Sequence, residues 1–178
     1  RLTERLAAHE RPDIEAAVRL LSSEGGYLPG VALELDDETL EGVVADQARL
    51  GSGWVKLVGD WPRRGIGPQP NFTEDQMRRA VERAGAEGSR VAIHTMARDV
   101  PSMAVRAGVQ SIEHGLFLTS DDLGTLAGNG GMWVPTILRV EHTIAQLGAE
   151  SSGGRLLLEG LDNVRRLLGE SVDAGVHV

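Results

Sequence analysis

Short apolar runs alternate with amphipathic segments along most of this chain, and that alternation constrains the fold more than any other feature. Four runs are rich in β-branched or aromatic residues and typical of strands, at residues 54–58, 91–94, 111–114 and 132–134. Helical spacing of apolar residues follows them, at residues 73–84, 100–107, 121–127 and 155–172, and a final strand begins at Val176. Strands separated by helices, without tandem hairpins, predict a parallel α/β sheet.

The remaining segments have weaker patterns. Residues 14–21 predict a helix, residues 27–35 a loop or irregular strand, and residues 38–50 a helix. Residues 61–71 are rich in proline and glycine and predict a long loop, a feature that is often functional. The chain begins at Arg1 and stops inside an apolar run, so we expect residues 1–178 to be a segment of one domain in a longer protein. Residues 1–50 are its helical or irregular part.

Composition narrows the class of protein. The 178 residues are 41% hydrophobic, enough for one sizeable core, and no run approaches the roughly 20 apolar residues of a membrane span. There is no cysteine, which excludes disulfides and cysteine-based zinc sites. A net charge of −8 disfavours nucleic acid and anionic membranes, which select basic surfaces. We expect a cytoplasmic protein that acts on a small molecule. A homo-oligomeric state is compatible with the sequence.

Lys56 lies inside a predicted strand, on the same face as Trp54, Val58 and Asp60. Parallel strands are usually covered on both faces, so we expect Lys56 to be substantially buried and its pKa to be lowered. A neutral amine can form a Schiff base, act as a base, or add carbon dioxide to become a carbamate that bridges two metal ions. The plainer interpretation is a lysine whose ammonium group reaches water at the strand end.

His94 and His114 end two consecutive strands. A single buried histidine is more often a hydrogen-bonded core residue than a ligand. The carboxyl ends of the strands of a parallel barrel meet at one rim, however, so Lys56, His94 and His114 point to one small volume. Neutral imidazole is a good zinc ligand. Both a doubly wound sheet and a (β/α)8 barrel fit the pattern of strands and helices.

Four stretches of the chain resemble the amidohydrolase superfamily, in particular its imidazolonepropionase-like and prolidase-like metal-dependent hydrolases. The resemblance covers roughly residues 40–178, and its most specific element is the run from Ala107 to Gly115. The stretches are Trp54-Val55-Lys56-Leu57-Val58-Gly59-Asp60-Trp61, Val91-Ala92-Ile93-His94, Ala107-Gly108-Val109-Gln110-Ser111-Ile112-Glu113-His114-Gly115 and Trp133-Val134-Pro135-Thr136.

The resemblance implies an incomplete (β/α)8 TIM-type barrel, roughly strands 4 to 8 with part of the preceding region. Lys56 would be a carbamylated bridging ligand on the fourth strand. His94 and His114 would end the fifth and sixth strands and bind one metal. The resemblance also implies a divalent metal cofactor, in the form of two zinc ions. The full-length protein would cleave an amide, cyclic amide or peptide-like C–N bond with a metal-activated hydroxide.

Two expected parts of the site are missing from this sequence. The family's His-x-His pair on the first strand does not occur, and its catalytic aspartate at the end of the eighth strand would lie beyond Val178. We therefore expect the segment alone to be inactive. Substrate contacts are predicted for Asp60 and Trp61 at the rim, for Arg139 and His142 after the following strand, and for Tyr27 in the glycine-rich region.

Two other functions remain open. A barrel enzyme that forms a Schiff base on Lys56 would use the same amine, but it leaves His94 and His114 without a shared purpose. A non-catalytic relative that lacks a complete metal site would explain the missing His-x-His pair. No Gly-x-Ser-x-Gly elbow occurs, which disfavours serine hydrolysis.

Overall fold

The computed structural model describes residues 12–178 of the chain. Its main sheet has six strands, all parallel, in the order β2-β1-β3-β6-β7-β8. The strands are β1 (Leu20–Ser23), β2 (Ala32–Leu35), β3 (Trp54–Val58), β6 (Arg90–Thr95), β7 (Ser111–His114) and β8 (Met132–Val134). The predicted parallel α/β sheet is confirmed.

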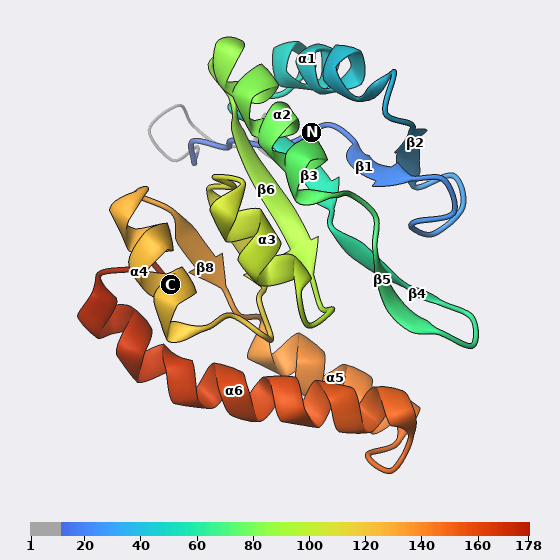
Figure 1. The fold of residues 1–178 in the computed structure, drawn as a ribbon, viewed down its shortest axis with the longest axis vertical. Helices are drawn as coiled ribbons and strands as arrows, with labels where there is room; N and C mark the ends of the chain where they lie inside the picture. The colour runs from blue at the N-terminus through green and yellow to red at the C-terminus, as the bar shows by residue number, and fades with distance from the viewer. Residues whose placement is uncertain (1–11) are drawn as a thin grey trace.

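Helices alternate with most of these strands (Figure 1). They are α1 (Leu40–Leu50), α2 (Glu74–Ala86), α3 (Val100–Arg106), α4 (Ser120–Gly128), α5 (Ile137–Leu147) and α6 (Ser152–Ala174). Helices α1, α2 and α3 pack on strands β3, β6 and β7, and α6 packs against α4 and α5. The long α6 crosses the lower edge of the molecule in Figure 1.

Helix α2 shows why these segments form where the sequence places them. Thr73 is its N-cap, and Thr73 and Gln76 form a reciprocal capping box that satisfies two free backbone N–H groups. Met77, Ala80 and Ala84 lie at helical spacing and are fully buried against the sheet side. The helix therefore begins at the predicted residue and buries the predicted face.

The two faces of the sheet differ. Alternate side chains of the strands are fully buried beneath the helices; they are Val55, Leu57, Val91, Ile93, Ile112 and Trp133. Their neighbours line a hollow of about 480 Å³ on the other face, with Lys56, Ala92, Ser111 and Glu113 among them. The expectation that both faces are covered holds only in part among residues 12–178, but the Lys56 side chain is still only 20% exposed.

Two local predictions from the sequence are wrong, and one helix has no predicted counterpart. Residues 14–21 are not helical, because the apolar residues at their end enter strand β1. Most of the predicted loop at residues 61–71 is an antiparallel hairpin of β4 (Asp60–Arg63) and β5 (Gly67–Pro70). Helix α5 was not predicted at all. Proline at a two-stranded edge leaves the hairpin pairing intact, because a missing N–H can face solvent there.

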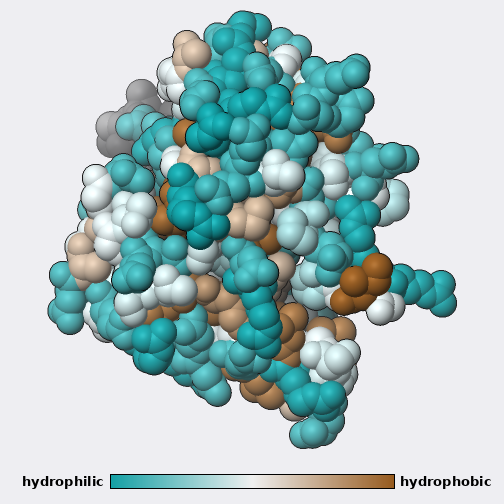
Figure 2. All heavy atoms as spheres, in the orientation of Figure 1, coloured by the Kyte–Doolittle hydropathy of each residue, from teal (hydrophilic) through white to brown (hydrophobic). Residues whose placement is uncertain are grey.

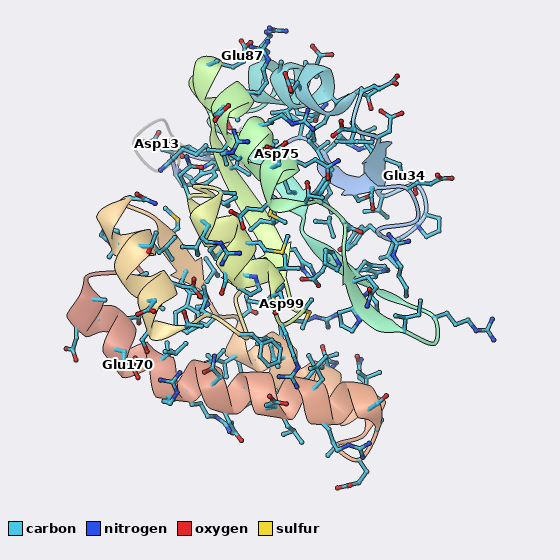
Figure 3. The ribbon with its side chains drawn as sticks, in the orientation of Figure 1. Asp13, Glu34, Asp75, Glu87, Asp99 and Glu170 are labelled. Carbon is cyan, nitrogen blue, oxygen red and sulfur yellow. The ribbon has the colours of Figure 1, made fainter. Side chains whose placement is uncertain are left out.

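The charged side chains of this acidic chain are dispersed over its surface. Figure 2 shows a mostly hydrophilic face with only scattered apolar patches. The acidic residues labelled in Figure 3 are spread over the molecule and do not form one cluster, and several pair with arginines, as Glu87 does with Arg49. Among the described residues, none of the helices has the length and apolar character needed to cross a membrane.

Candidate functional site

The register of the sheet places Lys56 and His94 on one face. Lys56 pairs with Ala92, and Val58 pairs with His94, so the lysine and the histidine lie on adjacent strands one pleat apart. Both side chains are partly exposed, in contrast to their neighbours on the same strands, which are fully buried: Val55, Leu57, Val91 and Ile93. The predicted convergence of these two residues is therefore present in the fold.

His114 reaches the same place through an unusual backbone conformation. Strand alternation would send Glu113 to the open face and His114 toward the helices. His114 instead has a φ of 64°, in the left-handed region that non-glycine residues rarely adopt, and its Nε2 lies 2.9 Å from Nδ1 of His94. The side-chain indole N–H of the buried Trp133 donates to the His114 carbonyl at 2.9 Å and holds this turn in place.

Thr136 completes the support of His114. Its hydroxyl lies 2.5 Å from His114 Nδ1, and Thr136 also has a positive φ, of 49°. His114 and Thr136 are the non-glycine residues with positive φ in the described part of the chain, and they contact each other. Such strained residues persist where the surrounding structure holds them, and they are often found at functional sites.

Asp60 is the most deeply buried charged residue of the site, at 0% exposure. Its Oδ2 accepts hydrogen bonds from the backbone N–H groups of Met96 and Ala97, at 2.8 and 2.9 Å. Burial raises the pKa of Asp60 to about 6, and these two hydrogen bonds oppose the shift. Its Oδ1 points toward His94 Nε2 at 4.0 Å.

Glu113 accompanies Lys56 on the open face. Its carboxylate lies 3.5 Å from Lys56 Nζ and accepts a hydrogen bond from the Ser111 hydroxyl at 2.9 Å. Burial lowers the pKa of Lys56 to about 8, although the charge of Glu113 and its hydrogen bond act in the opposite direction. The sequence analysis gave Glu113 no role; its place two residues after Ser111 on the open face was the available signal.

Burial also keeps both histidines neutral. It is the main reason that the pKa of His94 is lowered to about 3, with the nearby charges of His114 and Lys56 adding to the effect. The pKa of His114 is lowered to about 4, first by burial and then by the Lys56 charge, against the opposing effect of Glu113. Neutral imidazole nitrogens are competent metal ligands at pH 7.

Of the two aromatic residues predicted to contact substrate, Trp61 lies beside His94, and Tyr27 packs against Trp61. The rings of Tyr27 and Trp61 meet edge to face at 4.4 Å, and the Trp61 ring lies 6.1 Å from that of His94. Asn71 fixes this region, since its amide donates to the carbonyls of Gly26 and Val58, each at 2.8 Å. The loop carrying Tyr27 and the hairpin carrying Trp61 thus form one wall next to His94.

Arg139 and His142 are less closely associated with the site. Both are exposed on α5, and His142 contacts Gln146 of the same helix at 3.0 Å. The Arg139 charge is near enough to lower the pKa of His114, whereas nothing connects His142 with the other predicted residues. The structure brings together Lys56, His94, His114, Asp60, Trp61 and Tyr27.

The donor set fits part of a metal site. His94 Nδ1 and His114 Nε2 are separated by 2.9 Å, close to the spacing of two nitrogens at about 2 Å from one zinc ion. Within residues 12–178, however, there is no group of three or more His, Cys, Asp or Glu side chains arranged to hold a metal. Lys56, the only lysine of the chain, is the remaining basic group near both rings.

Comparison with sequences gives relatives without a described activity. No family model matches the chain. Uncharacterized proteins of Mycobacterium tuberculosis and Mycobacterium bovis are each 41% identical to it over 133 residues, 74% of this chain. The aligned part is 36% of the length of these curated relatives, so the chain spans little more than a third of them.

Comparison with solved structures identifies the fold. A. niger ochratoxinase matches with a TM-score of 0.78 and 18% identity, over 94% of this chain and 45% of that one. An amidohydrolase matches with a TM-score of 0.74 and 21% identity, over 94% and 47%. A prolidase complexed with n-methylphosphonate-l-proline matches with a TM-score of 0.71 and 21% identity, over 90% and 46%. The chain therefore has the fold of nearly half of each of these proteins, an ochratoxinase, an amidohydrolase and a prolidase.

Proposed function

We propose that the full-length protein is a metal-dependent hydrolase that cleaves a C–N bond. The observation that carries this proposal is the meeting of His94 Nδ1 and His114 Nε2 at 2.9 Å beside Lys56. The structural neighbours support the reaction class, because they include a prolidase, an amidohydrolase and a phenylurea hydrolase. Since the chain spans only part of these proteins, the activity is assigned to the longer protein and not to this segment.

The site residues have separate roles in this proposal. His94 and His114 would each give one ring nitrogen to a divalent metal, zinc by its preference for imidazole. Lys56, whose pKa is lowered to about 8, would add carbon dioxide through its neutral amine and lose a proton, which gives a bridging carbamate. The bound metal would supply an activated water molecule and polarise the substrate carbonyl. The remaining ligands and the proton-transfer aspartate would come from the rest of the protein.

The cover of the sheet supports an incomplete (β/α)8 barrel over a doubly wound sheet, because helices bury one face of the described strands and the other face lines a hollow. From β1 through β3, β6, β7 and β8, each strand lies beside the next in the chain, and His177 pairs beside β8. A doubly wound sheet reverses its order at a switch point and places helices on both faces. Strand β2 follows β1 in sequence but lies on its outer side, an order that doubly wound sheets also have, so the open face of the sheet and not the strand order distinguishes the two folds.

The substrate is proposed to be a small amide, cyclic amide or peptide-like molecule. Tyr27 and Trp61 offer an aromatic surface beside His94, and Arg139 offers a cation near His114 for a substrate carboxylate. A cytoplasmic location and the absence of nucleic-acid and membrane partners remain part of the proposal, as does a homo-oligomeric state.

Hydrolysis assays on the full-length protein test the proposal. A panel of dipeptides, N-acyl amino acids and cyclic amides is incubated with zinc-loaded protein, and amine release is followed. We expect turnover of at least one class, and loss of at least 100-fold in kcat/KM in His94→Ala and His114→Ala. His142→Ala, at an exposed histidine, is the control. Equal turnover in the wild type, the two variants at His94 and His114, and the control would contradict the proposal.

A Schiff-base enzyme is the second candidate, because a lysine with a pKa near 8 is also a nucleophile. Borohydride treatment in the presence of an aldehyde or ketone would trap Lys56 if it forms an imine. Mass spectrometry of the tryptic peptide locates the adduct. A stoichiometric adduct on Lys56, together with no metal uptake, would favour this candidate over the hydrolase.

A further inference from the structure

Two buried polar atoms face each other without a hydrogen-bond partner. They are Asp60 Oδ1 and His94 Nε2, and each is shielded from solvent in the described structure. Their separation of 4.0 Å is beyond a hydrogen bond but too short for an intervening water. Leaving two such groups unpaired costs free energy, so the structure has a reason to bring them together. Hydrogen bonds at catalytic sites are often long before ligands bind and become shorter afterwards.

Asp60 is anchored so that only one of its oxygens is available. Oδ2 accepts from the backbone N–H groups of Met96 and Ala97, which lie just after strand β6, two and three residues beyond His94. Both donors require an acceptor, so Oδ2 cannot turn away without leaving them unpaired. Oδ1 is therefore fixed toward His94.

The carboxylate determines the direction of a chain of hydrogen bonds. An ionised carboxylate only accepts, so His94 has its proton on Nε2, and its Nδ1 becomes an acceptor. His114 Nε2 then donates to His94 Nδ1, and the Thr136 hydroxyl donates to His114 Nδ1. The hydrogen bonds from Thr136 through His114 to His94 run in this one direction, and the approach of His94 Nε2 to Asp60 Oδ1 at 4.0 Å continues it.

We propose that Asp60 is a positioning residue that fixes His94 in the Nε2–H tautomer and thereby turns the Nδ1 lone pair toward the metal position. This inference rests on the proposed function for its consequence, because in the metal-free protein that lone pair accepts from His114 Nε2, and a metal would take the place of that proton while His114 carries its proton on Nδ1, toward Thr136. It replaces the earlier prediction that Asp60 contacts substrate. A carboxylate that orients a ligating histidine typically contributes about 10- to 100-fold to metal affinity.

Asp60→Asn tests the inference because it should reverse the tautomers without unfolding the site. The backbone N–H groups of Met96 and Ala97 still need an acceptor, so they hold the new side-chain oxygen, and the amide N–H₂ faces His94. His94 Nε2 then has to accept. Its proton moves to Nδ1, and the direction of every contact back to Thr136 reverses.

Nitrogen NMR reads the tautomers directly. Full-length protein labelled with ¹⁵N histidine is stripped of metal with a chelator, and His94→Gln and His114→Gln assign the signals. In the wild type we expect both histidines to be protonated on Nε2, and in Asp60→Asn both on Nδ1. Asp122→Asn is the matched control, because Asp122 is also a buried aspartate but lies in the capping box of α4. It should leave both tautomers unchanged.

Zinc titration against a competing chelator provides the second measurement. We expect Asp60→Asn to weaken zinc binding by about 10- to 100-fold and Asp122→Asn to leave it unchanged. An Nδ1–H tautomer of His94 in the wild type, unaltered tautomers in Asp60→Asn, or unaltered zinc affinity in that variant would each overturn the inference. If the wild type binds no zinc, the proposed function fails, and the tautomers alone then decide the role of Asp60.

Discussion

His94 and His114 are buried as neutral rings, and this determines how the fold responds to acid. Their folded pKa values of about 3 and 4 lie below the ordinary value of 6.5, so the unfolded chain binds more protons than the folded one between these limits. Each pKa unit corresponds to about 1.4 kcal/mol. Asp60 acts in the opposite direction, because its raised pKa favours the folded state at low pH and loses that contribution as pH rises through about 6.

The first prediction concerns this pH dependence. The free energy of unfolding of the metal-free protein should fall as pH is lowered from about 6.5 toward 4, since the two histidines outweigh the single aspartate. His114→Gln should make the profile shallower, and His142→Gln, at an exposed position, should not. Urea unfolding at several pH values measures this, and identical profiles for the three proteins would contradict it.

Single residues show both the strength and the limit of the sequence analysis. Lys56, His94 and His114 were found because strand ends in a parallel sheet converge, and their type suggested a metal. The partners Glu113 and Thr136 were not found. Their contacts depend on the left-handed turn at His114, which no spacing rule predicts for a histidine. Lys56 is also the only lysine in the chain, which sets it apart from the arginines that supply the other basic side chains.

The ends of strands β3 and β6 are joined through a close contact at Gly59. Its N–H donates to the His94 carbonyl at 2.9 Å, and a Cβ on Gly59 would lie 2.7 Å from that oxygen. No side chain fits there without moving one strand end away from the other. The distance between Asp60 and His94 therefore depends on this glycine.

The second prediction compares two substitutions of glycine by alanine. Gly59→Ala should lower the free energy of unfolding by about 1–3 kcal/mol, as overpacking does, and should weaken metal binding because Asp60 moves. Gly169→Ala lies inside helix α6 with open space around it and should raise stability by up to about 1 kcal/mol. Urea unfolding measures the change in the free energy of unfolding for both variants. Equal changes would show that Gly59 is not tightly packed.

The third prediction concerns the wall made by the Tyr27 loop and the hairpin. Asn71 is only 8% exposed, and Asn71→Ala leaves the carbonyls of Gly26 and Val58 without their donor. We expect a loss of about 2 kcal/mol or more in the free energy of unfolding. The emission of Trp61 should also change, because Tyr27 would no longer be held against it. An unchanged spectrum would mean that Asn71 does not position the wall.

At the level of elements, helices and central strands could be predicted better than edges. Helix α2 and strands β3, β6, β7 and β8 have strong periodic patterns, and the structure contains them close to the predicted bounds. The β4–β5 hairpin was missed because its prolines and glycines resemble a loop. Helix α5 was missed because it begins at the strained Thr136, without a side-chain cap.

At the scale of the whole molecule, the strands of one sheet bring together residues that are far apart in the sequence. The alternation of strands and helices in the sequence fits both a doubly wound sheet and a barrel, and only the family resemblance favours the barrel. The strand order of the described residues also occurs in doubly wound sheets, whereas their single covered face agrees with the proposed barrel. Such a sheet places its carboxyl strand ends on one rim, so a ligand there can be held by residues from many strands.

The central claim is that Lys56, His94 and His114 belong to one metal site with a carbamylated lysine. Metal content of the full-length protein, loaded with zinc in the presence and absence of bicarbonate, tests it most directly. We predict that bicarbonate raises the zinc content of the wild type and that Lys56→Ala takes up little zinc under either condition. Zinc uptake that is indifferent both to bicarbonate and to the loss of Lys56 would contradict the claim.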